Sequence, residues 1–395
     1  MDSKIYWLFA FVGLYWAYCI FWGIKGARTS KTSEDYFVAG RSIGTWVFVL
    51  AATATSFSGW TFVGHPGKIL TDGLPYAFAS FYALTIPFTG VLFLRRQWVL
   101  GRAFNYITPG EMYSDYYGGN AIRGLTVLVA FLFSVPYLGI QLRASGALFN
   151  VLTDGMISTN IGMILLSTVV VIYVASGGLR SVAYVDCAQA VLLALGIIIL
   201  GIITLTWIGG WELFTRGIGD LVRIDIMQGK RLTLEGFSNR VSMPGSIQLV
   251  SSGSQATGGV WTGMMCMTYM FALMGIQSSP AFSMWAYANK TSKPFRWQQV
   301  VASSIVIGII LFTFTIIQGL GADVLVVNGV FDSISDTNLV PNLINLMSSS
   351  TPWLVGLLAV CALAAMQSTG AAYMSTFSAM ITRDIYKNYY NNNAS

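Results

Sequence analysis

The sequence predicts an all-α membrane protein that crosses the bilayer several times, and its composition, the lengths of its apolar segments and the charges of its loops all support this fold class. Of the 395 residues, 55% are hydrophobic and only 10% are charged, and the mean hydropathy is +0.64. Soluble globular domains carry roughly 25% charged residues. The 12 Trp and 19 Tyr suit the two membrane interfaces. A single histidine excludes a histidine-based metal cluster.

Nine segments of roughly 20 residues or more are apolar enough to cross a bilayer. They cover residues 5–24, 44–66, 74–94, 124–150, 157–177, 185–209, 259–288, 300–320 and 353–382. The first segment is too long for a signal-peptide core and has neither a basic start nor a small-residue cleavage site. We therefore expect it to remain as a span.

The loop charges predict which membrane face each loop occupies. Basic residues gather after the first, third, fifth and seventh segments and in the tail. They are Lys25, Arg28, Lys31, Arg41, Arg95, Arg96, Arg102, Arg123, Arg180, Lys290, Lys293, Arg296, Arg383 and Lys387. The opposite short loops hold only Lys4 and Lys68, and the rule loses force in the long loop 210–257. We expect a plasma (inner) membrane protein with its N-terminus outside and its C-terminus cytoplasmic. The net charge of +6 reflects this bias, and no nucleic-acid partner is expected.

Two stretches of small and hydroxyl residues stand out inside the apolar segments. Residues 364–370 read AAMQSTG and residues 51–59 read AATATSFSG. The bilayer gives a cation no water, so side-chain hydroxyls and the carbonyls of unwound backbone must replace its hydration shell. The two stretches predict the walls of a sodium site. The alternative is that Ser368 and Thr369 bond back to carbonyls four residues earlier in their own helix.

Five motifs, in order along the chain, resemble those of the sodium:solute symporter family. They are residues 33–41 (SEDYFVAGR), 58–67 (SGWTFVGHPG), 108–111 (TPGE), 177–189 (GGLRSVAYVDCAQ) and the pair 368–369 (ST) with 382–387 (TRDIYK). The resemblance covers about residues 33–387.

The resemblance implies the leucine-transporter fold, in which two inverted five-helix repeats surround a site at the bilayer midplane. Residues 1–41 would hold the first span and a cytoplasmic loop, 42–210 the first repeat, 211–257 a long extracellular loop, 258–387 three helices of the second repeat, and 388–395 a polar tail. The second repeat is then incomplete. We interpret the chain as a C-terminally truncated member, with a compact natural variant as the alternative.

The resemblance also implies the ligands of one sodium ion. The backbone carbonyls of Ala54 and Phe57 would face it from the break in the second segment. The carbonyl of Ala365 and the hydroxyls of Ser368 and Thr369 would face it from the ninth.

Some family members hold a second sodium ion with an aspartate and two further hydroxyls. Asp186 is present here, but the hydroxyl positions are Ala371 and Ala372. We therefore expect one sodium ion, with Asp186 pairing with Arg180 or capping the sixth span.

Arg143 is the leading candidate for solute binding, because it is charged in the middle of a span, where a charge is costly and commonly functional. A guanidinium binds a carboxylate with two hydrogen bonds. A snorkelling or carbonyl-bound arginine is the alternative. Gln277 and Ser278 lie in a Gly-polar-Pro stretch that predicts an unwound helix, and Gln141 is a further candidate. His65 is expected near the external vestibule.

These observations together predict a sodium-coupled secondary symporter that imports a small polar or anionic solute, a carboxylate if Arg143 binds it. No catalytic constellation predicts an enzyme, and the partners expected are the solute and the lipid bilayer, with no obligate protein partner evident. The alternatives are a membrane sensor derived from a symporter and a fragment that does not transport.

Overall fold

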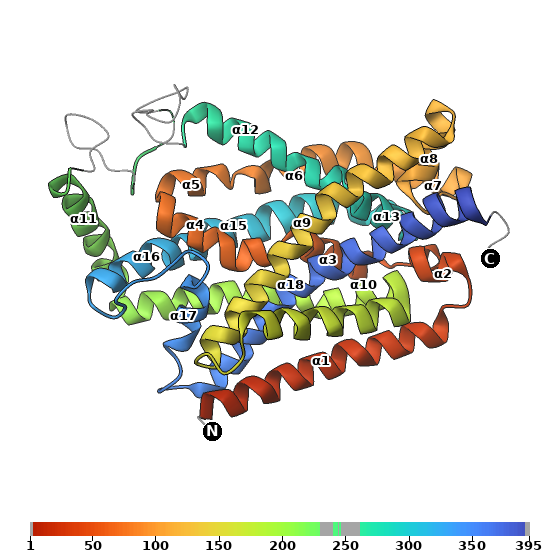
Figure 1. Cartoon of the computed structure of the whole chain (residues 1–395). Coiled ribbons are helices and arrows are strands. Elements are labelled where there is room, and N and C mark those ends of the chain that lie inside the picture. The colour runs from red at the N-terminus through yellow and green to blue at the C-terminus, as the bar shows by residue number, and fades with distance from the viewer. Residues whose placement is uncertain (1–2, 230–239, 244, 246–260, 392–395) are drawn as a thin grey trace.

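The computed structural model describes residues 3–229, 240–243, 245 and 261–391, and within them the chain is helical, with no strand. Six helices in the described part are long and apolar enough to cross a membrane, or seven if the bent pair Thr45–Ser56 and Trp60–Asp72 counts as one. Figure 1 shows the helices lying roughly side by side, with the two termini at opposite ends of the molecule. An all-helical polytopic membrane protein is therefore confirmed.

The first half begins with one peripheral helix, which the core helices follow. Its elements are α1 (Ser3–Thr29), α2 (Ser33–Val38), η1 (Ala39–Arg41), α3 (Thr45–Ser56), η2 (Trp60–Gly64), α4 (His65–Asp72), α5 (Leu74–Ala79), α6 (Tyr82–Thr89), η3 (Gly90–Leu94), α7 (Arg95–Phe104), α8 (Pro109–Tyr117), α9 (Asn120–Leu152) and α10 (Thr159–Ile208). Two predicted spans, 157–177 and 185–209, fall within α10. They meet at a kink where Gly178 has φ +57°, a conformation that glycine adopts without strain.

The second half starts with α11 (Trp211–Met227), which lies in what we expected to be a long loop. The remaining elements are α12 (Gly263–Met274), η4 (Gly275–Ser278), α13 (Pro280–Ala288), α14 (Pro294–Arg296), η5 (Trp297–Ile307), α15 (Gly308–Ile310), η6 (Leu311–Thr315), α16 (Ile316–Val327), α17 (Leu339–Asn345), α18 (Pro352–Met380) and η7 (Ile381–Tyr390). The last helix thus continues past the expected boundary at residue 387. The rest of the expected loop, 230–239, 244 and 246–257, and the tail 392–395 lie outside the described residues.

Local sequence signals explain several helix ends. Thr32 and Asp35 form a capping box at the start of α2, and Thr108 and Glu111 form another at α8, where Pro109 occupies the first helical position. Each box satisfies backbone N–H groups that the helix itself leaves unpaired. The second box lies in the motif 108–111, and the first is formed by Asp35 of the motif 33–41 with Thr32, directly before that motif.

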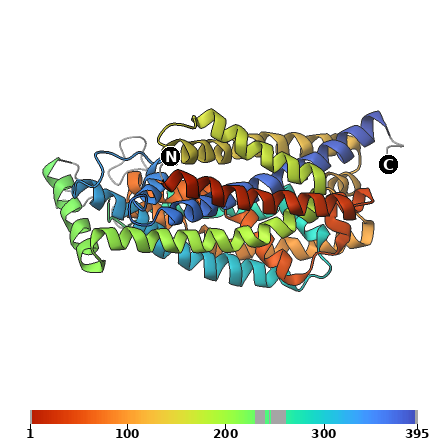
Figure 2. The same cartoon turned by 90° about the horizontal axis from the view of Figure 1, so that it is seen from below.

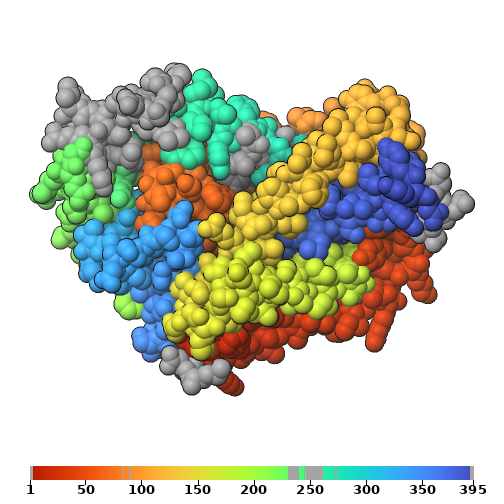
Figure 3. Space-filling view, in the orientation of Figure 1, coloured from red at the N-terminus to blue at the C-terminus, as the bar shows by residue number. Residues whose placement is uncertain are grey.

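The helix α18 forms the centre of the molecule. It packs against α1, α9 and α10, and Figure 3 shows α9 lying across it on one face. Its residues from Val355 to Met380 are almost all buried, and many of them are alanine. Small side chains let neighbouring helices approach closely inside a membrane. This close packing holds α18 against the break in the helix formed by α3, η2 and α4.

Candidate functional site

The site is built around the break between α3 and η2. The helix α3 ends at Ser56, Phe57 adopts an extended conformation, and the chain bends by 55° before Trp60. The backbone N–H of Gly59, which would donate to Thr55 in a continuous helix, donates instead to Gln141 Oε1 at 2.9 Å. The break therefore leaves carbonyls at the end of α3 without their usual backbone donors.

Two hydroxyls of α18 meet these carbonyls. Ser368 Oγ lies 3.0 Å from the carbonyl oxygen of Ala54 and 3.2 Å from that of Ala365. Thr369 Oγ1 lies 3.3 Å from the carbonyl oxygen of Thr55. All of these residues are buried. The break and α18 thus place hydroxyl and carbonyl oxygens around one point in an apolar interior.

The hydroxyls of Ser368 and Thr369 do not bond only to carbonyls of their own helix. Other hydroxyls of the break, such as Thr55 and Ser56, do donate to the carbonyl four residues earlier. Ser368 instead divides its contacts between its own helix and α3, and Thr369 contacts only α3 among the described residues. These cross-helix contacts connect α18 to the end of α3.

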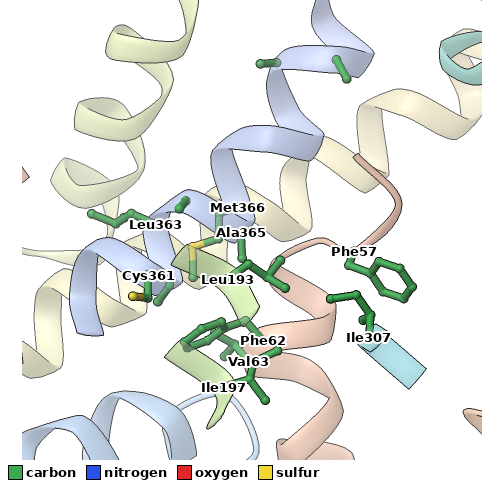
Figure 4. Close-up of a cluster of buried hydrophobic side chains, with 14 of the residues drawn as sticks. Phe57, Phe62, Val63, Leu193, Ile197, Ile307, Cys361, Leu363, Ala365 and Met366 are labelled. Atoms are coloured by element: carbon green, nitrogen blue, oxygen red, sulfur yellow. The ribbon is translucent and has the colours of Figure 1, made fainter. Parts of the chain in front are cut away.

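Apolar side chains pack around the break (Figure 4). Ala365 and Met366 lie beside the break, the ring of Phe57 lies next to Ile307, and further apolar side chains come from η2 and α10. The carbonyls of Ala54 and Ala365 and the hydroxyls of Ser368 and Thr369 are brought together. Phe57 lies in the break itself, with φ −114° and ψ 102°.

Asp186 differs from both of our expectations for it. It is fully buried within α10, and its Oδ2 accepts a hydrogen bond from Thr55 Oγ1 at 3.4 Å. Arg180 lies elsewhere: it donates to the carbonyl of Ala39 and is 3.8 Å from Asp35. Both residues follow the kink at Gly178, and their separation of six positions spans about one and two-thirds helical turns, so their side chains leave the helix on different sides. Asp186 therefore neither pairs with Arg180 nor caps a helix.

Arg143 lines a cavity of about 580 Å³ next to the break. The cavity also includes Gly59 and Trp60 from the break and Lys68 from α4, with Asp336 on its far wall. Arg143 makes no hydrogen bond or ion pair among the described residues. Its guanidinium is exposed and therefore available to a solute.

The other three predicted solute residues do not share this cavity. Gln141 is buried and holds the backbone of the break. Gln277 is buried and donates to Ser56 Oγ at 3.1 Å, so it joins the second unwound segment, η4, to the end of α3. Ser278 is exposed in a separate cavity of about 740 Å³ between α8, α9 and η4.

His65 does not face a vestibule. It is buried, and its two ring nitrogens contact the hydroxyls of Ser80 and Thr315. Thr315 donates its own hydrogen to the carbonyl of Leu311. The Nδ1 atom of His65 therefore donates to Thr315, and Nε2 accepts from Ser80. The histidine ties α4 to α5 and η6 and has no nitrogen left for a solute.

Sequence reasoning missed three participants in the break. The carbonyl of Thr55 contacts Thr369, Ser56 contacts Gln277, and Gln299 donates to Gln277 Oε1 at 2.8 Å. Gln298 and Gln299 lie just before residue 300, where we began the eighth apolar segment. The signal available in the sequence was the pair of adjacent glutamines beside a membrane span, because an amide side chain buried there needs a hydrogen-bond partner.

The family model of the sodium:solute symporter family matches residues 36–395. The chain belongs to the sodium:solute symporter family. This places it in a family of transporters and not of enzymes. The five motifs quoted above therefore identified the family correctly.

The relatives it resembles include transporters of different small molecules. It is 34% identical over 176 residues to high-affinity choline transporter 1 of Drosophila melanogaster, covering 44% of this chain and 28% of that one. It is 27% identical over 198 residues to the sodium/proline symporter of Escherichia coli (strain K12), covering 48% and 38%. This chain therefore aligns with less than two fifths of the length of these relatives.

A solved structure supports the fold of the whole chain. The outward-open, substrate-bound structure of a Na⁺-coupled sialic acid symporter superposes with a TM-score of 0.75 at 18% identity, covering 100% of this chain and 77% of that one. At this identity the likeness establishes the fold. The leucine-transporter-like arrangement that the motifs implied agrees with this match.

Proposed function

We propose that the chain forms the sodium- and solute-binding part of a sodium-coupled symporter that imports a small solute bearing a carboxylate. The observation that carries this proposal is the meeting of Ser368 and Thr369 on α18 with the carbonyls of Ala54 and Thr55 at the break. Sodium is transported cargo in this proposal. Its ligands would be these hydroxyls with the carbonyls of Ala54, Phe57 and Ala365.

One sodium ion per cycle follows from the side chains around Asp186. Ala371 and Ala372 contribute only methyl groups, and the hydroxyl hydrogen-bonded to Asp186 among the described residues belongs to Thr55. Sodium requires several oxygen ligands in place of water. A second site of the family type would lack two of them.

The solute class follows from the cavity that holds Arg143. Two basic side chains, Arg143 and Lys68, line it against one acidic side chain, Asp336. Lys68 lies 3.9 Å from Asp72, whereas Arg143 has no such partner among the described residues. A free guanidinium favours a carboxylate, which proline and sialic acid carry, over a quaternary ammonium such as choline.

The proposed orientation places the Arg143 cavity on the outside. Lys68, Thr159 and Asp336, which line it, lie in or beside loops on the side with few basic residues. The basic loops containing α2, α7 and α8 and the C-terminus gather at the opposite end (Figure 1). By the positive-inside rule this second end is cytoplasmic.

The test is thermal unfolding of the purified, detergent-solubilised chain in sodium against potassium at equal ionic strength. A ligand that binds only the folded state stabilises it by RT ln(1 + [L]/Kd), about 1.4 kcal/mol when the ion is at ten times Kd. We expect a sodium-specific rise in Tm that Ser368→Ala abolishes.

Ser375→Ala is the matched control. Ser375 is a buried serine on the same helix, and its hydroxyl has no hydrogen-bond partner among the described residues. It should keep the full sodium response. An equal loss in both variants, or no sodium response in a well-folded wild-type chain, would refute the proposed site.

A further inference from the structure

A small pocket of about 310 Å³ lies between α1 and α10, away from the sodium and solute cavities. Residues of α1 form one wall and residues just after the Gly178 kink form the other. The lining residues are Trp22, Lys25, Gly26, Thr29, Arg180, Ser181 and Tyr184. Figure 2 shows α1 running along α10 over this length.

Close packing holds the two walls in place. The rings of Trp22 and Tyr184 stack with centroids 4.5 Å apart and planes within 9°. Tyr18 donates to the carbonyl of Tyr184 at 3.0 Å. A methyl group on Gly26 would come within 2.8 Å of the Gly177 backbone, so the helices are already in contact at the base of the pocket. The pocket is therefore a built feature of the helix interface.

The pocket is basic. Lys25 Nζ lies 4.4 Å above the Trp22 ring and forms no ion pair with a described carboxylate. Arg180 donates to the carbonyl of Ala39 and lies 3.8 Å from Asp35, which neutralises it only in part. None of the lining residues is acidic, and the hydroxyls of Thr29 and Ser181 donate to backbone carbonyls, so Lys25 and Arg180 set the charge of the pocket. Such a lining favours a ligand with negatively charged oxygens.

The setting of the pocket is the membrane interface. Lys25 lies in the last turns of α1, next to the basic loop that precedes α2. Phe21 and Ile24, on the same turns, are 57% and 48% exposed, so they offer apolar surface beside the pocket. Trp and Tyr are enriched at this depth of a bilayer. A ligand here would meet charge at one end and hydrocarbon at the other.

We propose that this pocket binds the phosphate group of an anionic phospholipid in the cytoplasmic leaflet, with the acyl chains along Phe21 and Ile24. Basic pockets between transmembrane helices on the cytoplasmic side are suited to such headgroups. The assignment of the leaflet rests on the proposed orientation, whereas the pocket chemistry does not depend on sodium or solute binding.

The experiment is native mass spectrometry of the delipidated, detergent-solubilised chain with phosphatidylglycerol, phosphatidylcholine or inorganic phosphate. We expect phosphatidylglycerol to bind more tightly than phosphatidylcholine. Lys25→Gln should weaken phosphatidylglycerol about fivefold, the change that corresponds to about 1 kcal/mol per basic side chain at a membrane surface. Arg28→Gln is the matched control, because Arg28 is exposed on the same helix but does not line the pocket.

The outcomes separate the possible sources of the anion. Equal binding of the two lipids, or equal weakening by Lys25→Gln and Arg28→Gln, would overturn the proposal. Competition by inorganic phosphate as strong as that of the lipid would assign the pocket to a soluble anion instead. Without sodium or lipid, Lys25→Gln should keep the Tm of the unsubstituted chain, which shows that the variant is folded and keeps this test independent of the proposed transport function.

Discussion

At the scale of single residues, the candidate site depends on the acceptors to which the N–H and O–H groups around the break donate. Gly59 donates to Gln141, and Ser368 and Thr369 donate to Ala54 and Thr55. A buried polar group without a partner costs about 1–3 kcal/mol, so these side chains allow the helix to stay open inside the protein. The same hydroxyl oxygens keep lone pairs that a cation can use.

Arg143 gives the residue-scale prediction. Arg143→Ala should weaken binding of a carboxylate solute by about 10- to 100-fold, because a hydrogen bond to a charged group contributes about 1.5–3 kcal/mol. Arg143→Lys keeps the charge but cannot donate two parallel hydrogen bonds to a carboxylate, so it should retain only part of the affinity for the solute. Thermal shifts with L-proline, sialic acid and choline would measure this, and only the two acids should respond to the substitution.

Arg216→Gln is the control for general charge effects. Arg216 is an exposed residue of α11 that pairs with Glu212 on the same helix. If Arg143→Ala removes the sodium response together with the solute response, Arg143 has a structural role and the solute assignment fails. Equal effects of Arg143→Ala on choline and on the acids would contradict the carboxylate class.

At the scale of helices, glycine sets the closest approach between α1 and α10. A methyl group added to Gly23 would lie 2.8 Å from the Tyr173 backbone, and one added to Gly26 would lie 2.8 Å from that of Gly177. Small residues at such an interface let two helix backbones touch in the membrane, where there is little hydrophobic drive for association.

We therefore expect Gly26→Ala to lower the free energy of unfolding by about 1–3 kcal/mol, the usual cost of overpacking. Gly13→Ala is the control on the same helix, because a methyl group there meets no atom within 4 Å. It should be neutral or slightly stabilising, since alanine is the better helix former. Thermal unfolding of the two variants checks this, and equal loss in both would show that helix propensity and not contact decides.

The helices themselves were largely predictable from the sequence, whereas their fine geometry was not. A long apolar run such as 353–382 predicts a transmembrane helix, because its length is enough to cross the bilayer. The predicted end of a span at residue 177 lies one residue from the kink at Gly178, whereas the π-helical segments η5 and η6 were not predicted. His65 illustrates the limit, because its two hydroxyl partners come from α5 and η6 and no local pattern brings them together.

In the candidate site, too, the sequence identified candidate residues but not their positions relative to one another. Ser368 and Thr369 were predicted as sodium ligands because their hydroxyls interrupt an apolar run and match a family motif. The four solute candidates, Arg143, Gln141, Gln277 and Ser278, were chosen for polarity within spans. Polarity does not say which face a residue occupies, and in the structure they divide between one cavity, the core and a second cavity.

At the scale of the whole molecule, the two cavities lie at opposite ends of α9. The Arg143 cavity adjoins the break at Gly59, and the other adjoins η4 and Pro280. Between them Tyr373 of α18 contacts Ser279 at 3.1 Å and packs against Tyr137 with ring centroids 5.3 Å apart. This arrangement suits a transporter whose inner and outer halves open in turn around a fixed site.

The shared break predicts reciprocal coupling between the two ligands. Gly59 and Trp60 line the Arg143 cavity, while Ala54 and Thr55, just before them, contact α18 at the candidate sodium site. If sodium orders the break, it must raise solute affinity by the same factor by which the solute raises sodium affinity. Calorimetric titration of sodium with and without L-proline or sialic acid, and of the solute with and without sodium, should give equal factors. The sodium isotherm should have a Hill coefficient near one. Ser368→Ala should reduce the coupling factor to about one, whereas unequal factors or a coefficient clearly above one would show that a second ion or a different element carries the coupling.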